Sequence, residues 1–98
     1  MESRKYHVYI MSSLSGVLYI GVTGHLEGRL SQHKRGEIDG FTKDYRCTHL
    51  VYYEEFEYVL DAIAREKQLK KWSRVKKLRL IETLNPRWED LGADIAAE

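Results

Sequence analysis

The 98-residue sequence lacks the features that would place it in a membrane, in an oxidising compartment or in several common enzyme classes. It contains a single cysteine, Cys47, and therefore cannot form an internal disulfide, which agrees with a reducing compartment. No apolar run approaches the roughly 20 residues of a membrane span, and residues 8–11 are too few for a signal peptide. It also lacks a Gly-rich phosphate loop and a G-x-S-x-G turn. We expect a cytoplasmic protein with no membrane partner and no small-molecule cofactor.

Composition and length predict one soluble globular domain. Hydrophobic residues make up 43% of the chain and charged residues 32%, and 98 residues suffice for one modest core. We place this domain at residues 1–92. Residues 93–98 are small and acidic, and we expect them to form a frayed tail.

The net charge of +1 conceals an uneven distribution of charge along the chain. Half of the 16 Lys and Arg residues fall between positions 65 and 79, where Glu66 is the only acid. These are Arg65, Lys67, Lys70, Lys71, Arg74, Lys76, Lys77 and Arg79. Such a cluster can attract a polyanion, but it can equally be the solvated face of a helix. Charge alone does not decide between these interpretations.

Hydrophobic periodicity predicts a β-hairpin followed by a helix, a third strand and two more helices. Apolar and polar residues alternate over residues 5–11 and 18–22, which are joined by a Ser/Gly-rich turn. This alternation places Tyr9 and Tyr19 on the same face of the sheet. Helices are predicted over residues 25–36, 58–71 and 73–84, with a strand over 50–53. Ser73 is positioned to cap the last helix, and Asn85-Pro86 ends it.

Glu66 stands on the predicted core-facing stripe of the second helix. The apolar residues Val59, Ile63 and Leu69 share that stripe. A carboxylate there is costly unless it is paired or bound to a cation. One interpretation is a ligand for Mg²⁺, which prefers carboxylate oxygen. The other is an ion pair with Arg65 or Lys70, and the helix pattern leaves both open.

Other candidate residues also have both a structural and a functional interpretation. Tyr9 and Tyr19 are ordinary strand residues as well as possible site residues, and Gly21 beside them would let a backbone or ligand approach closely. Arg29 and His33, four residues apart, share one helix face. They could bind phosphate and transfer a proton, or they could simply be exposed to solvent.

Taken in order, these residues resemble a known family. The sequence has V-Y-I at 8–10, Y-I-G at 19–21, R-L-S-Q-H at 29–33, R-E-K-Q-L-K-K-W at 65–72 and N-P-R-W-E-D-L at 85–91. This order resembles the GIY-YIG nuclease superfamily over nearly the whole chain, and especially its small bacterial single-domain members. The first motif departs from the family pattern, because it reads H-V-Y rather than G-I-Y, but its tyrosine is kept.

The resemblance implies an α/β (α+β) domain, with a three-stranded antiparallel sheet flanked by helices, that acts as a metal-dependent endonuclease. It assigns catalytic roles to Tyr9, Tyr19, Arg29, His33, Glu66 and Asn85. Glu66 would be the metal ligand for one Mg²⁺ or Mn²⁺ ion. Tyr9 and His33 remain alternative general bases, and a tyrosine base would need its pKa lowered from about 10, which metal and arginine charges favour.

We expect the partner to be nucleic acid, DNA rather than RNA, and either single-stranded or structured. The expected nucleic-acid contacts are Gly21, Lys67, Lys70, Lys71, Arg74, Lys76 and Lys77. Two alternatives stay open: a non-catalytic nucleic-acid-binding module, and a nuclease subunit that is activated by a partner.

Overall fold

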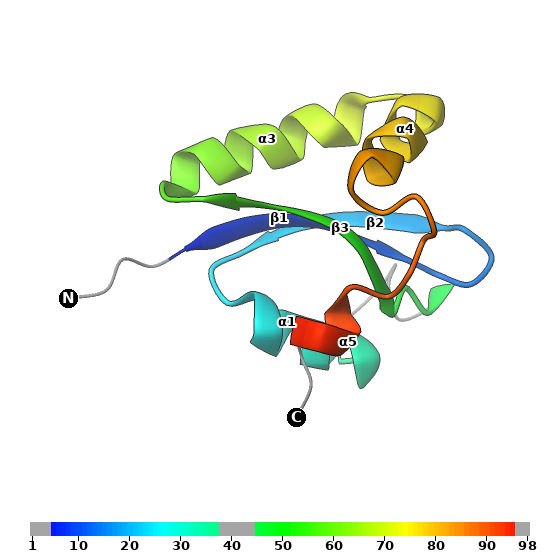
Figure 1. The fold of residues 1–98 in the computed structure, drawn as a ribbon. Coiled ribbons are helices and arrows are strands. Elements are labelled where there is room, and N and C mark those ends of the chain that lie inside the picture. The colour runs from blue at the N-terminus through cyan, green and yellow to red at the C-terminus, as the bar shows by residue number, and fades with distance from the viewer. Residues whose placement is uncertain (1–4, 38–44, 96–98) are drawn as a thin grey trace.

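The computed structural model describes residues 5–37 and 45–95 of the chain (Figure 1). Their elements are β1 (Tyr6–Ser12), β2 (Leu18–Thr23), α1 (Leu26–Lys34), β3 (His49–Phe56), α3 (Val59–Lys71), α4 (Arg74–Leu84) and α5 (Gly92–Ile95). The predicted hairpin, third strand and helices are confirmed in this order. Within the described ranges, no helix is long and apolar enough to cross a membrane.

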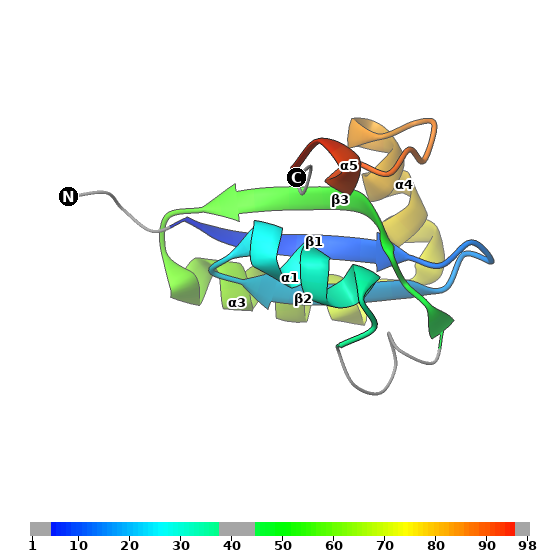
Figure 2. The same cartoon turned by 90° about the horizontal axis from the view of Figure 1, so that it is seen from below.

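The three strands form an antiparallel sheet in the order β2-β1-β3, as predicted. Helices α3 and α4 lie on one face of this sheet, and α1 and α5 lie on the other (Figures 1 and 2). Side chains alternate between the two faces, so the sheet separates two cores. Val8 and Ile10 pack towards α3 with Ala62 and Leu69. Tyr9 and Met11 lie in the second core, with Leu26 and Leu30 of α1.

The turn between β1 and β2 is fixed by Ser13 and by α4. The backbone N–H of Val17 donates to the Ser13 hydroxyl at 2.9 Å, and Gly16 takes a φ of +93°, which favours glycine. Arg74 at the start of α4 donates to the Gly16 carbonyl at 2.7 Å. The hairpin tip is therefore tied to the helical layer.

The helix ends follow the sequence signals, whereas β3 is longer than predicted. The Ser73 hydroxyl accepts a hydrogen bond from the Lys76 backbone N–H at 3.2 Å, which is the expected cap of α4. The strand was predicted over residues 50–53, whereas β3 spans His49–Phe56. The strand continues beyond residue 53, since Glu54 and Glu55 still pair with β1.

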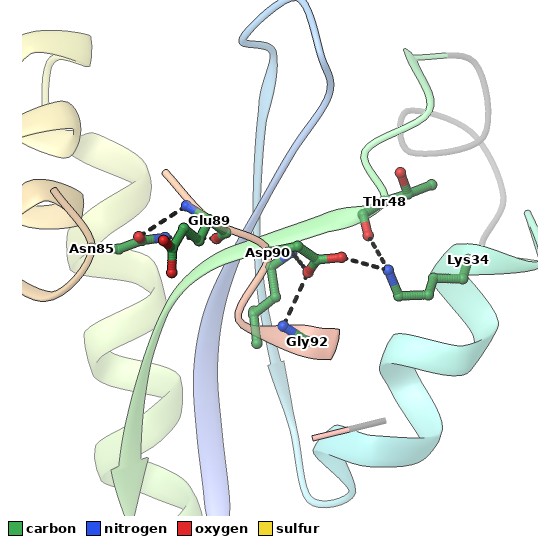
Figure 3. Close-up of polar contacts among 7 residues, drawn as sticks. Lys34, Thr48, Asn85, Glu89, Asp90 and Gly92 are labelled. Carbon is green, nitrogen blue, oxygen red and sulfur yellow. Dashed lines mark hydrogen bonds and ion pairs between the residues drawn. The ribbon is translucent and has the colours of Figure 1, made fainter. Parts of the chain in front are cut away.

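The C-terminal segment is more ordered than the sequence suggested. Gly92–Ile95 forms α5, where the sequence suggested a frayed tail from residue 93 onwards, and residues 96–98 lie outside the described part of the chain. The Asp90 carboxylate explains this order (Figure 3). It accepts hydrogen bonds from the backbone N–H groups of Leu50 and Gly92, each at 3.0 Å, and pairs with Lys34 of α1 at 2.8 Å. One side chain thus joins β3, α1 and α5.

Candidate active site

Tyr9 lies at the centre of the sheet face that α1 covers. Its position in the middle strand places it opposite Gly21 of β2 and Tyr53 of β3. The side chain is completely buried, and its hydroxyl lies 3.1 Å from Nε2 of His33, within hydrogen-bonding distance. A residue of β1 and a residue of α1 are therefore joined inside the core.

Gly21 makes room for the Tyr9 ring. A Cβ atom at position 21 would lie 2.5 Å from the Tyr9 hydroxyl oxygen and 2.6 Å from its Cζ, far inside normal contact distance. The sequence predicted a close approach at this glycine by a nucleic acid. The structure gives another cause, because Gly21 is buried and the approaching group is the phenol of Tyr9.

Tyr9, Tyr19 and His33 form a cluster of three rings, as the alternation of the strands and the position of His33 on α1 allow. The ring centroids of Tyr19 lie 6.3 Å from Tyr9 and 5.4 Å from His33, and those of Tyr9 and His33 are 5.6 Å apart. Arg29, one helical turn before His33, is near enough for its charge to act on the Tyr9 phenol. The structure thus brings together four of the six predicted catalytic residues.

Burial decides the protonation of this cluster. It raises the pKa of the Tyr9 phenol well above its ordinary value of 10.0, with Tyr19 adding to the rise and Arg29 opposing it. The expected lowering by arginine is present but is outweighed, so Tyr9 is a neutral phenol in the protein alone. Burial, followed by the charge of Arg29, lowers the pKa of His33 to about 4. His33 is therefore a neutral imidazole at pH 7 and can accept a proton.

Glu66 belongs to α3, on the other side of the sheet from α1, and is half of an ion pair. Its carboxylate lies 2.7 Å from the ammonium of Lys70, and its side chain is only 14% exposed. Of the two cations that the sequence offered as partners, Lys70 is the one that pairs with Glu66, and the metal-binding role stays a prediction. Lys70 also lines a hollow together with Tyr19, so this pair lies along the β2 edge that leads to the ring cluster.

A single divalent ion suits Glu66 by its chemistry. Within the described ranges, no group of three or more His, Cys, Asp or Glu side chains could form a closed metal site. Mg²⁺ is commonly bound by one or two carboxylates, with water and substrate phosphates completing its shell. One carboxylate beside a hollow lined by Lys70 fits that pattern, and it would leave most of the ion's ligands to come from the substrate and water.

Comparison with known proteins agrees with this arrangement. The family described as the GIY-YIG catalytic domain matches residues 5–79. The chain belongs to the GIY-YIG nuclease family. UPF0213 proteins of Staphylococcus aureus strains Mu50 and COL are 41% identical to it over 75 residues, which is 76% of this chain and 92% of theirs. The solution NMR structure of a UPF0213 protein from Bacillus halodurans matches with a TM-score of 0.58 and 26% identity, over 91% of this chain and 95% of that one.

This GIY-YIG domain carries a histidine where the first motif has its glycine. His7 shares the sheet face of Tyr9, with its Nε2 3.5 Å from the carboxylate of Glu55 and its ring edge-on to Tyr53. Burial lowers the pKa of His7, and Glu55 acts against that shift. The neighbouring residues on β3 therefore accommodate the side chain, and Tyr9 keeps its place.

Asn85 is not part of the ring cluster of this GIY-YIG domain. Its amide donates to the carbonyls of Val51 at 3.2 Å and Glu89 at 2.8 Å. Its oxygen accepts from the Glu89 N–H at 3.0 Å (Figure 3). Val51 is on β3, separated from β2 by the middle strand. All these contacts hold the chain after α4 against the sheet. These contacts give Asn85 an architectural role, and the catalytic role that the resemblance implies for it stays a prediction.

The basic run of residues 65–79 divides into side chains with structural contacts and side chains that are exposed. Arg65 binds the Glu54 carboxylate through two nitrogens at 2.9 Å each, and Lys76 lies 4.7 Å from the Trp72 ring centroid. These cations hold α3 and the start of α4 in place. Lys67 and Lys71 are exposed on α3.

Hollows with cationic walls surround the ring cluster. One hollow, of about 620 Å³, adjoins His33, and we call it the His33 cavity. It lies between the hairpin tip at residues 13–15, the end of α1 and residues 45–49. Two hollows of about 360 and 270 Å³ share Leu18 and Lys77. Together they follow the chain from residue 15 in the hairpin tip to residue 20 in β2. We call this pair the β2 groove. Another hollow, of about 350 Å³, includes Arg29.

The walls of these hollows contain no acid among their described residues, although the chain has 15 acidic residues. Their Lys and Arg side chains are Arg29, Lys34, Arg35, Arg46, Lys70, Arg74 and Lys77. Sequence reasoning missed Lys34 and Arg35 at the end of α1, and Arg46, because they lie outside the basic run of residues 65–79. Lys34 pairs with Asp90 and Arg35 with Glu37 in the protein alone. Their arrangement suits a polyanion that passes the ring cluster.

Proposed function

We propose that this chain is a divalent-metal-dependent endonuclease that hydrolyses phosphodiester bonds in DNA. The observation that carries the proposal is the buried contact between Tyr9 and His33, with Tyr19 and Arg29 packed around it. Family membership supports hydrolysis of nucleic acid, and the acid-free hollows on either side support a polyanionic substrate.

In the proposed mechanism Tyr9 and His33 act together as the base. The neutral imidazole of His33 accepts the Tyr9 proton at Nε2 while the Tyr9 oxygen takes a proton from the attacking water. Neither group then has to act alone, since the pKa of Tyr9 is raised and that of His33 is lowered. The negative charge of a bound phosphate would raise the pKa of His33 and strengthen this transfer.

Arg29 and Tyr19 would position the phosphate. Arg29 lies against the Tyr9 phenol in the protein alone, so it would exchange that contact for the non-bridging phosphate oxygens. This exchange would open the buried Tyr9 oxygen to water. Tyr19, which is partly exposed at the head of the β2 groove, would orient the phosphate or the water.

Glu66 would hold one Mg²⁺ or Mn²⁺ ion, which when bound stabilises charge on the leaving 3′ oxygen. To do so, the carboxylate must release Lys70, whose ammonium lies 2.7 Å away. Lys70 lines the β2 groove, so the released ammonium can pair with the substrate backbone.

The test pairs each catalytic substitution with a matched control. Tyr9→Phe and Glu66→Gln should abolish Mg²⁺-dependent cleavage of labelled single-stranded, duplex and branched DNA, while thermal unfolding shows a folded protein. Tyr53→Phe, on the same sheet face, and Glu82→Gln, on an exposed face of α4, should cleave at the wild-type rate. If the Glu66→Gln protein cuts as fast as the wild type, the proposal is wrong.

The same screen distinguishes a non-catalytic binding module. Such a module would bind these substrates and leave them intact in Mg²⁺ and in Mn²⁺. Including RNA substrates tests the choice of DNA.

A further inference from the structure

The His33 cavity is large enough for a single nucleotide. Its volume of about 620 Å³ lies within the range of about 300–1,000 Å³ that is typical of small-ligand sites. It is not part of the β2 groove, although both include Ser15 of the hairpin tip. A strand bound in the groove could therefore continue around the tip into the cavity.

The cavity offers partners for both parts of a nucleotide. Arg46 and His49 line it with no acid among its described wall residues, which suits a phosphate. Two large apolar side chains also line it and are exposed: Leu14 is 91% exposed and Tyr45 is 53% exposed. An aromatic ring of this kind gives a nucleobase a surface on which to stack.

His33 connects the cavity to the ring cluster. Its Nε2 contacts the Tyr9 hydroxyl, its ring lines the cavity, and its side chain is only 3% exposed. Within the part of the chain that the structure describes, its Nδ1 is buried and has no hydrogen-bond partner. A buried ring nitrogen without a partner is costly, so the protein alone leaves the hydrogen bonding of His33 incomplete.

We infer that the His33 cavity binds one unpaired nucleotide next to the scissile phosphate, with the phosphate of that nucleotide at Arg46 and its base against Tyr45 and Leu14. The inference rests on the proposed function and narrows its substrate. A base within a duplex is stacked and paired and cannot enter such a cavity. The cavity therefore selects single strands, or unpaired nucleotides at a flap or junction.

Binding of a short fluorescein-labelled oligothymidylate to the full chain in EDTA, where no cleavage interferes, tests the cavity. Arg46→Gln should lower the slope of log affinity against log salt by about 0.7, the value for one phosphate contact on a single strand. Arg87→Gln makes the same charge change at an exposed position outside these hollows and should leave the slope unchanged. Tyr45→Ala should weaken binding at least about 5-fold, whereas Tyr45→Phe keeps the ring and the affinity.

Photo-crosslinking with 4-thiothymidine in the same oligomer gives a second readout, independent of any variant. Crosslinks to residues 13–15 or 45–49 support the inference. Crosslinks confined to α3 and α4, or equal effects of Arg46→Gln and Arg87→Gln, overturn it even if the wild-type chain cleaves DNA. A chain that neither cleaves nor binds any nucleic acid overturns the proposed function, and the inference with it.

Discussion

Substituting Gly21 with alanine tests whether the site depends on the fixed position of the Tyr9 phenol. The added Cβ would lie 2.5 Å from the phenol oxygen, where normal contacts begin at about 3.5 Å, so the ring must move by about 1 Å. Tyr9 is fully buried and packs in the second core with Met11, Leu26 and Leu30. The movement therefore strains the core or breaks the 3.1 Å contact with His33.

Two magnitudes follow for Gly21→Ala. Overpacking costs about 1–3 kcal/mol, and the smaller entropy of the unfolded chain returns about 0.4–1 kcal/mol. We expect a net loss of about 1–2 kcal/mol in the free energy of unfolding. A misplacement of 1 Å in a catalytic group lowers the rate by about 100-fold. Urea unfolding and single-turnover cleavage measure the two effects separately.

Gly28→Ala is the matched control for Gly21→Ala. Its Cβ would also meet a side chain at 2.5 Å, but that side chain is the exposed ring of His25, which can rotate away. Alanine inside α1 should instead add about 1 kcal/mol of stability through its helix propensity, with cleavage unchanged. If Gly21→Ala cleaves and unfolds like the wild type, Tyr9 is not held as we describe, and the reasoning about this site fails.

Three further predictions concern separate features. Lys70→Gln frees the Glu66 carboxylate from a partly exposed ion pair that is worth up to about 1 kcal/mol. Mn²⁺ should therefore bind about 2- to 5-fold tighter to this variant when affinity is measured by calorimetry. Equal affinity would contradict the role of Lys70 as a competing cation. The folded-state pKa of His33 is about 4, below its unfolded value of 6.5. As pH falls, the unfolded chain therefore gains this proton before the folded protein does. The free energy of unfolding should fall by at most about 3 kcal/mol as pH drops from 6.5 to 4. In urea titrations, His33→Asn should reduce this dependence of the free energy of unfolding on pH. Asn85→Ala removes three hydrogen bonds and should lower the free energy of unfolding by about 2–3 kcal/mol, without changing the cleavage rate of the folded protein. If the folded variant cleaves more slowly than the wild type, Asn85 has a catalytic role.

Features that depend on one periodic element could be predicted from the sequence. Period-two alternation placed Tyr9 and Tyr19 on one face, and helical spacing named Lys70 as a partner of Glu66. The lowering of the Tyr9 pKa by arginine could be anticipated from the sequence, but the larger rise caused by burial could not, because the depth of burial cannot be read from a sequence.

Features that join separate segments could not be predicted. The His33 cavity draws on the hairpin tip, α1 and residues 45–49, which share no repeat. The order of α5 depends on the Asp90 carboxylate, which joins three elements at once. The contacts that give Asn85 its architectural role likewise depend on β3 and the Glu89 backbone, distant or irregular parts of the chain.

The acid-free hollows make the overall charge a poor guide to how this protein behaves in solution. A net charge of +1 and an isoelectric point near 7.9 suggest weak retention on an ordinary cation exchanger. A flexible polyanion such as heparin, however, interacts with charges within the Debye length of about 8–10 Å. It therefore responds to the cations near its binding surface rather than to the net charge of the whole protein. The protein should therefore elute from heparin at a higher salt concentration than its isoelectric point implies, and it should carry cellular nucleic acid through low-salt purification.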